Sequence, residues 1–182
     1  MKIFYTLLFF TLLSNGSFSQ IFQSTSCIVD IYSNTPVEEI KAKNKNASSI
    51  INFTTGDIVF RVPNSGFKFD NALMEEHFNE NYMETHKYPN CEFKGKIMQL
   101  VDWKKVGSYK VTVTGNLKAH GVEVERTISG TIHVKADVII IESKFNVPLK
   151  DHKIEVPKLV ISNLSDSIAV NIDANYAPFV KK

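Results

Sequence analysis

The chain is dominated by runs in which hydrophobic and polar residues alternate, which is the pattern of β-strands with one buried face. In residues 109–114 an aromatic or aliphatic side chain alternates with Lys or Thr. Similar alternation recurs over residues 57–62, 122–134, 139–147 and 168–176. These runs predict about eight half-buried antiparallel strands. Two of them flank a turn at residues 119–121 and are longer than ordinary strands, so we expect a tall hairpin there.

Residues 71–83 leave this alternation and follow a helical period. Met74, Phe78 and Tyr82 recur at every fourth position, and Asp70-Asn71 offers a helix N-cap. This predicts one helix, which ends before Pro89. Its apolar stripe must cover a sheet face or the open end of a barrel, so we expect it to act as a cap.

Eight antiparallel strands can close into a barrel with room for side chains or one small ligand. The competing arrangement is a sandwich of two sheets, and the length of the strands favours the barrel. Residues 44–49 are mostly polar and are interpreted as a loop. The fold class predicted from the pattern is therefore all-β, with one capping helix.

The first residues are predicted to be a signal peptide rather than part of the fold. Lys2 precedes an apolar run over residues 3–13 that is too short to span a membrane, and small residues at Ser17 and Ser19 precede Gln20. We expect cleavage after residue 19, so that residues 20–182 form a single exported domain. Export places the protein in an oxidising compartment.

Composition supports an ordinary globular domain and excludes one class of partner. The chain of 182 residues is 43% hydrophobic, and its 21 Lys and Arg against 19 Asp and Glu are spread along its length. Without a basic stripe, nucleic-acid binding is not expected. Residues 20–182 contain 17 Val and 17 Ile against 6 Leu and 8 Ala. Because β-branched side chains pack well on a pleated surface, this bias also predicts an all-β fold.

No pattern of catalytic or metal-binding residues is present. The two cysteines, Cys27 and Cys91, are not in a CxxC motif or a Cys/His cluster, and both a disulfide and a pair of free thiols fit this sequence. The histidines, including His77, His86 and His120, have no metal-ligand spacing. A Gly-rich phosphate loop and a nucleophile elbow are also missing. We therefore expect neither an enzyme nor a resident cofactor.

Several motifs resemble one known family. They are Leu73–Thr85, Lys87-Tyr88-Pro89 with Phe93-Lys94-Gly95, Tyr109–Leu117 with His120-Gly121-Val122, and Phe145-Asn146-Val147 with Asp151 and Pro157. In order and approximate spacing they resemble the YceI-like family of exported lipid-binding or polyisoprenoid-binding proteins, over roughly residues 57–175.

The resemblance implies a lipocalin-like, eight-stranded antiparallel barrel in the periplasm of a Gram-negative bacterium. Its interior would take the isoprenoid tail of a quinone or polyprenyl lipid, for storage or transport. The family's opening strand with a His, and its Arg-containing segment before an "fG" turn, are not visible in this chain, so the resemblance does not supply head-group contacts.

The candidate ligand-binding residues come from the apolar strand faces and from the helix. They are Met74, Phe78, Tyr109, Val111, Val113, Val124, Ile128, Ile139, Ile141, Phe145, Val170 and Ile172, together with Arg126, which interrupts one apolar face. An inward Arg126 can bind a phosphate or carbonyl head group, or it can pair with a nearby acid at the barrel end.

Other functions and partners stay open at this stage. Apolar strand faces also fill solid cores, so the alternative function is a filled-barrel interaction module of the cell envelope with no lipid ligand. Trp103 beside Lys104-Lys105 can touch a membrane surface transiently, or it can pack locally. A homodimer is a further partner to be tested.

Overall fold

A computed structural model describes residues 21–35, 39–155 and 164–180. The predicted signal peptide lies outside the described residues. The strands are β1 (Ile21–Asn34), β2 (Glu39–Asn44), β3 (Ser48–Asn52), β4 (Asp57–Pro63), β5 (Phe67–Phe69), β6 (Asn90–Ile97), β7 (Gly107–Ala119), β8 (Val122–Val134), β9 (Ile139–Pro148) and β10 (Ser167–Pro178). The helical segments are η1 (Asn64–Gly66), α1 (Ala72–His77), η2 (Phe78–Tyr82) and η3 (Leu149–His152).

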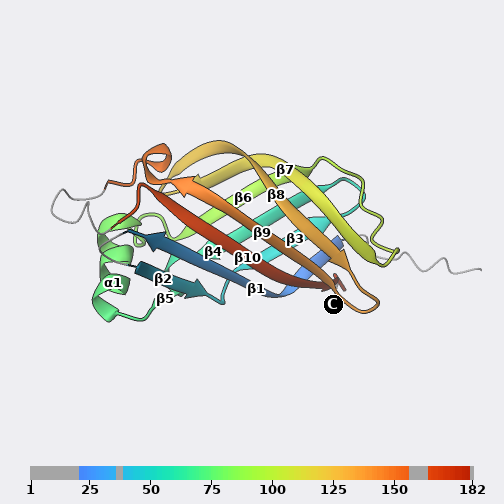
Figure 1. The fold of residues 1–182 in the computed structure, drawn as a ribbon, viewed down its shortest axis with the longest axis horizontal. Coiled ribbons are helices and arrows are strands. Elements are labelled where there is room, and N and C mark those ends of the chain that lie inside the picture. The colour runs from blue at the N-terminus through green and yellow to red at the C-terminus, as the bar shows by residue number, and fades with distance from the viewer. Residues whose placement is uncertain (1–20, 36–38, 156–163, 181–182) are drawn as a thin grey trace, which may run out of the picture.

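Eight of these strands close into an antiparallel barrel (Figure 1). The order β10-β9-β8-β7-β6-β4-β3-β1 is completed by pairing of β1 with β10, in a register that runs from Phe22↔Pro178 to Tyr32↔Ala169. The predicted all-β barrel is confirmed, and the sandwich alternative is wrong. The predicted tall hairpin is β7–β8, which is paired from Gly107↔Val134 to Ala119↔Val122.

The remaining strands, β2 and β5, extend the wall at one end of the barrel. The first residues of β1 pair with β3, whereas its second half pairs with β2, which in turn pairs with β5. Asn44 fixes this branch because its buried side chain donates to the carbonyl of Pro63 at 2.7 Å and accepts from the backbone N–H of Asn46. The interpretation of residues 44–49 as a loop was therefore wrong at both ends, since Asn44 ends β2 and Ser48 begins β3.

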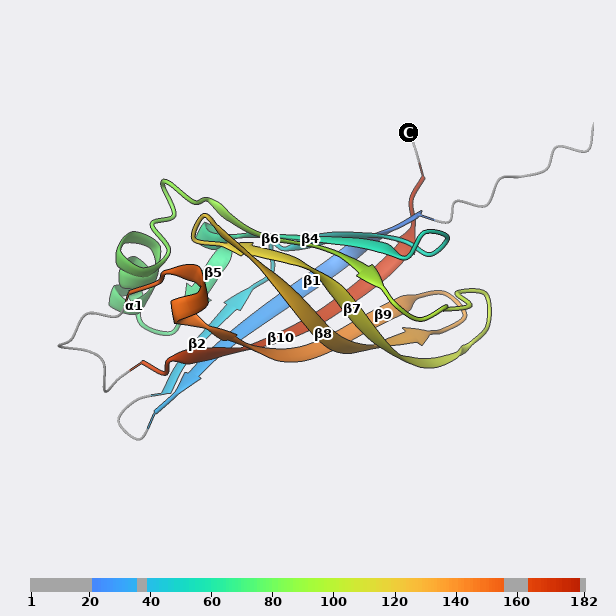
Figure 2. The ribbon, with the colours of Figure 1, turned by 90° about the horizontal axis from the view of Figure 1, so that it is seen from above.

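The helix predicted over residues 71–83 is confirmed as α1 followed by the π-helical turn η2. The Asn71 side chain caps it by accepting from the N–H of Leu73 at 2.9 Å. Phe78 packs on Phe67 and Phe69 of β5, with ring centroids 5.3 and 5.1 Å apart. The helix therefore lies at the end of the barrel where β5 is, as Figures 1 and 2 show. None of the helices among the described residues is long and apolar enough to cross a membrane.

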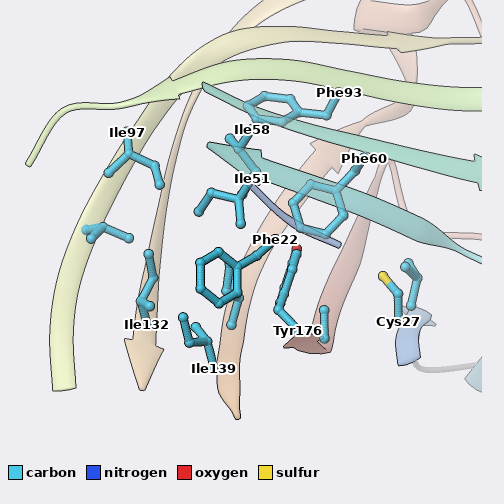
Figure 3. Packing of buried hydrophobic residues seen from close by; sticks show 14 of the residues in the cluster. Phe22, Cys27, Ile51, Ile58, Phe60, Phe93, Ile97, Ile132, Ile139 and Tyr176 are labelled. Atoms are coloured by element: carbon cyan, nitrogen blue, oxygen red, sulfur yellow. The ribbon is translucent and has the colours of Figure 1, made fainter. Parts of the chain in front are cut away.

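The opposite end of the barrel is filled by side chains. Phe22 at the start of β1 packs against Phe53 and Trp103 from two different loops, with centroids 5.4 and 5.3 Å apart. Tyr176 is buried beside Phe22 in Figure 3, and its hydroxyl donates to Ser49 Oγ at 2.6 Å. Trp103 thus packs locally, which is one of the two alternatives considered from the sequence. This half of the barrel has a solid core.

Candidate ligand cavity

The half of the barrel toward α1 is hollow. It contains a cavity of about 220 Å³, larger than the void of ~150 Å³ that holds a benzene molecule in an engineered protein. Its lining includes Ile58, Ile97 and Ile132 of the core cluster in Figure 3, but not Phe22 or Tyr176 of the same cluster. At the other end it reaches the helix, through Met74, Phe78 and other side chains of α1 and η2.

The cavity lining is almost entirely aliphatic and aromatic. Among the described residues that line it, Glu92 is the one with a formal charge, and it is paired with Lys94 at 3.6 Å. Because the walls are apolar and offer no cation to a bound anion, burial of an anion in this cavity is costly. Burial of a hydrocarbon chain is favourable. The arrangement suits a neutral, apolar guest.

The structure brings most of the predicted binding residues to this cavity. Its lining includes Met74, Phe78, Val111, Val113, Ile128, Ile141, Phe145, Val170 and Ile172. They come from α1, η2 and four neighbouring strands, β7 to β10, so each strand contributes its inward face. Their binding of a ligand stays a prediction.

Four predicted residues lie elsewhere. Ile139 is buried in the packed core, and the Tyr109 hydroxyl donates to the backbone carbonyls of Asp102 and Lys105, so neither lines the cavity. Val124 and Arg126 lie near the start of β8, in the part of the strand that contacts η3. Arg126 Nη2 donates to Asp151 Oδ2 at 2.7 Å, which is the acid-paired alternative considered from the sequence.

The sequence reasoning missed the contribution of the first strands and of the segments near the helix. Val29 and Ile31 of β1, Phe60 of β4, and Leu149 and Ile168 near the capped end also line the cavity. The alternation at residues 57–62 identified a strand with Phe60 on its apolar face. Alternation alone does not show which strands surround the empty part of a barrel, so this signal was insufficient.

Cys91 also faces the cavity, and its thiol donates to Asn64 Oδ1 at 3.3 Å. Asn64 is fully buried and donates in turn to the carbonyl of Tyr88 at 2.6 Å. Burial raises the pKa of Cys91 to about 12, so the thiol is neutral and unreactive at physiological pH. Cys91 and Cys27 are both free, which decides between the two alternatives in favour of unbridged thiols.

A polar network ties the segments around the capped end together. His120 lies in the β7–β8 turn, with its Nε2 atom 2.8 Å from Glu84 Oε2 and its Nδ1 atom 3.2 Å from the His152 carbonyl oxygen. This hydrogen bond with His120 is the main reason that the pKa of Glu84 is lowered. His152 is fully buried and donates from Nδ1 to the carbonyl of Val122, and burial lowers its pKa. No group of three potential metal ligands gathers anywhere in the described ranges.

Comparison with protein families now identifies the chain. The model of the YceI-like domain matches residues 16–176. The chain belongs to the YceI-like family. This agrees with the motif resemblance, and the structure explains part of it, because the rings of Tyr88 and His120 from two of the motifs pack edge to face with centroids 4.8 Å apart.

Solved structures show the same YceI-like barrel at low sequence identity. A polyisoprenoid-binding domain from Saccharophagus degradans, implicated in plant cell wall breakdown, is 14% identical with a TM-score of 0.75, over 87% of this chain and 98% of its own. BcnA from Burkholderia cenocepacia is 14% identical with a TM-score of 0.72, over 82% and 95%. The YCEI protein of Campylobacter jejuni is 17% identical with a TM-score of 0.62, over 77% and 85%. No curated protein matches the sequence.

Proposed function

We propose that this YceI-like protein binds a long-chain isoprenoid-type lipid in its barrel cavity, for storage or transport in the periplasm. The observation that carries the proposal is the apolar cavity in the half of the barrel next to α1. Burial of a hydrocarbon tail there contributes about 0.8 kcal/mol per CH₂ group. The similar barrel from Saccharophagus degradans is described as polyisoprenoid-binding, which supports the same class of ligand here.

The lining favours a neutral head group such as that of a quinone or an uncharged polyprenyl compound. Described lining residues include no Lys, Arg or His to pair with a phosphate or carboxylate. An anionic head group is therefore expected to stay outside the cavity, because burying an unpaired charge is costly.

The alternative function, a filled-barrel interaction module, is supported less well. A module without ligand requires side chains to fill the barrel along its whole length, as Phe22, Trp103 and Tyr176 do at one end. The cavity at the other end leaves inward apolar side chains without packing partners, which costs stability unless a guest contacts them.

Periplasmic location rests on the predicted signal peptide at residues 1–19.

A membrane contact is supported by the loop between β6 and β7, where Met98, Leu100 and Val106 are exposed beside Lys104 and Lys105. The homodimer considered from the sequence stays a prediction, and native mass spectra of the purified protein report it directly.

Native mass spectrometry with lipid extraction tests the proposed function. We expect a co-purifying neutral lipid in the wild-type protein and its loss in Ile128→Asp, which places a carboxylate in the cavity wall. Ile50→Asp is the matched control, because Ile50 is half exposed and does not line the cavity. A wild-type protein that carries no lipid and takes up no added quinone or polyprenol would overturn the proposal.

A further inference from the structure

The barrel wall is interrupted between β8 and β9. Their ladder runs only from Val134↔Ile139 to Gly130↔Ser143. Residues 122–129 of β8 and 144–148 of β9, all of them described, have no ladder pairing with each other, although each strand is fully paired on its other edge. We call this unpaired stretch the β8–β9 seam. Figure 2 shows the two strands diverging toward the end where α1 lies.

The cavity lies directly behind this seam. Ile128 and Ser129 on one side, and Phe145 and Val147 on the other, all line the cavity. On the outside, over the last pairs of the ladder beside the seam, a polar depression is lined by exposed residues such as Lys110 and Lys144.

The inner cavity and the outer depression share lining residues where the ladder stops. Val111, Ser129, Gly130 and Ser143 line both the inner cavity and the outer depression, so only one layer of residues separates them. Gly130 has no side chain to thicken the wall, and a Cβ atom there would lie 2.9 Å from the carbonyl oxygen of Glu142.

One ion pair joins β8 to the segment that follows β9. Arg126 on β8 binds Asp151 of η3, and both side chains are mostly buried, at 18% and 31% exposed. The Nε atom of Arg126 is buried and has no hydrogen-bond partner. His152 of η3 adds one hydrogen bond, to the carbonyl of Val122. These contacts hold η3 across the seam at its wide end.

Both ends of the barrel are closed by packed side chains. At one end Phe22 and Trp103 pack together, and at the other Phe78 packs on two aromatic rings while Met83 is buried. Passage through either end requires rearrangement of a packed cluster. Passage through the seam breaks no strand ladder, because none is present there.

We propose that ligand enters and leaves the cavity through the β8–β9 seam, and that the Arg126–Asp151 ion pair is the latch that keeps the seam closed. The inference rests on the proposed function. An apolar tail passes between the two strand edges when η3 moves away, which also takes Leu149 out of its cluster with Met83, while Phe22 and Trp103 at the opposite end stay packed.

The test measures rates and affinity with a probe, dansyl-labelled geranylgeraniol, in the full-length mature protein. Release from the loaded protein into excess phosphatidylcholine vesicles is followed by stopped-flow fluorescence, and affinity by titration. Arg126→Met is expected to accelerate release about tenfold, the effect of lowering a barrier by 1.4 kcal/mol. The matched control is Lys68→Met, which removes the ion pair between Lys68 and Glu75 beside α1.

A second pair of variants obstructs each route in turn. Lys144→Cys labelled with a bulky maleimide is expected to slow release about tenfold by obstructing the seam, whereas Leu73→Cys carries the same label on α1 and is expected to change little. Labelling is selective because Cys27 is buried and because burial raises the pKa of both Cys27 and Cys91, so that both thiols stay neutral. Equilibrium affinity is expected to stay within about twofold for all variants, because a gate changes both rates equally.

The outcomes separate the two proposals. Saturable probe binding with release that is slowed by the label at position 73, and unchanged by Arg126→Met and by the label at position 144, overturns the seam and leaves the proposed function standing. Absence of saturable binding rejects the proposed function and the seam together.

Discussion

Individual side chains show how strongly the filled half of the barrel excludes water. Cys27 is 1% exposed, and burial, with a smaller effect of Asp173, raises the pKa of its thiol to about 12. Burial also raises the pKa of Tyr176, whose hydroxyl is satisfied by Ser49. Both groups can ionise only if the surrounding packing opens.

This burial predicts a loss of stability at alkaline pH. Above the ordinary thiol pKa of 9.0, the unfolded chain releases the Cys27 proton while the native protein retains it up to a pH of about 12. The native state then binds more protons, so the free energy of unfolding falls with rising pH, by about 1.4 kcal/mol per pH unit for this group. Urea unfolding from pH 8 to 11 measures the slope.

Cys27→Ala is the control for this effect. Its slope above pH 9 is expected to be smaller than that of the wild type by the contribution of one proton. An unchanged slope would show that Cys27 does not hold its proton in the native state.

At the scale of elements, the β7–β8 hairpin depends on the fit between its turn and the segment after η2. His120 and Gly121 form a two-residue turn with φ angles of 48° and 74°, the left-handed region that favours glycine in such hairpins. Tyr88 packs directly on Gly121, so that a Cβ atom there would lie 2.4 Å from its ring. Glycine at position 121 therefore allows both the left-handed backbone conformation and the close contact with Tyr88.

Gly121→Ala is expected to lower the free energy of unfolding by about 2 kcal/mol, because it adds left-handed strain to a steric clash. Gly107→Ala is the matched control, since a Cβ atom at Gly107 would be in ordinary contact with Tyr109 at 3.6 Å. Chemical denaturation of both variants measures the difference. Equal stabilities would contradict the role assigned to the turn.

At the scale of the whole molecule, a barrel that is half solid and half hollow should gain stability from its guest. A ligand that binds only the native state stabilises it by about 2.7 kcal/mol at a concentration 100 times its Kd. Lipid-extracted protein is therefore expected to melt at a lower temperature than protein reloaded with a quinone or polyprenol, and differential scanning calorimetry measures the shift. A melting temperature that does not change when lipid is added would contradict binding to the native cavity.

Much of this architecture could be predicted from the sequence because it depends on local order. Alternation at residues 109–114 and 122–134 assigned inward and outward faces, and the fourfold spacing of Met74, Phe78 and Tyr82 with the Asn71 cap located the helix. These signals are periodic, so a few neighbouring residues are enough to read them. The choice of an eight-stranded barrel followed from the number and length of the strands.

Only the tertiary structure decided where the barrel is hollow and where it can open. Inward Ile139 lies in solid core whereas inward Ile141, two residues later, lines the cavity, because Phe22, Phe53 and Trp103 from distant parts of the chain meet at one end only. Likewise, Arg126 is on an apolar face in the sequence but pairs with Asp151 of η3. Periodicity fixes the direction of a side chain, whereas the space in front of it depends on residues brought together by folding.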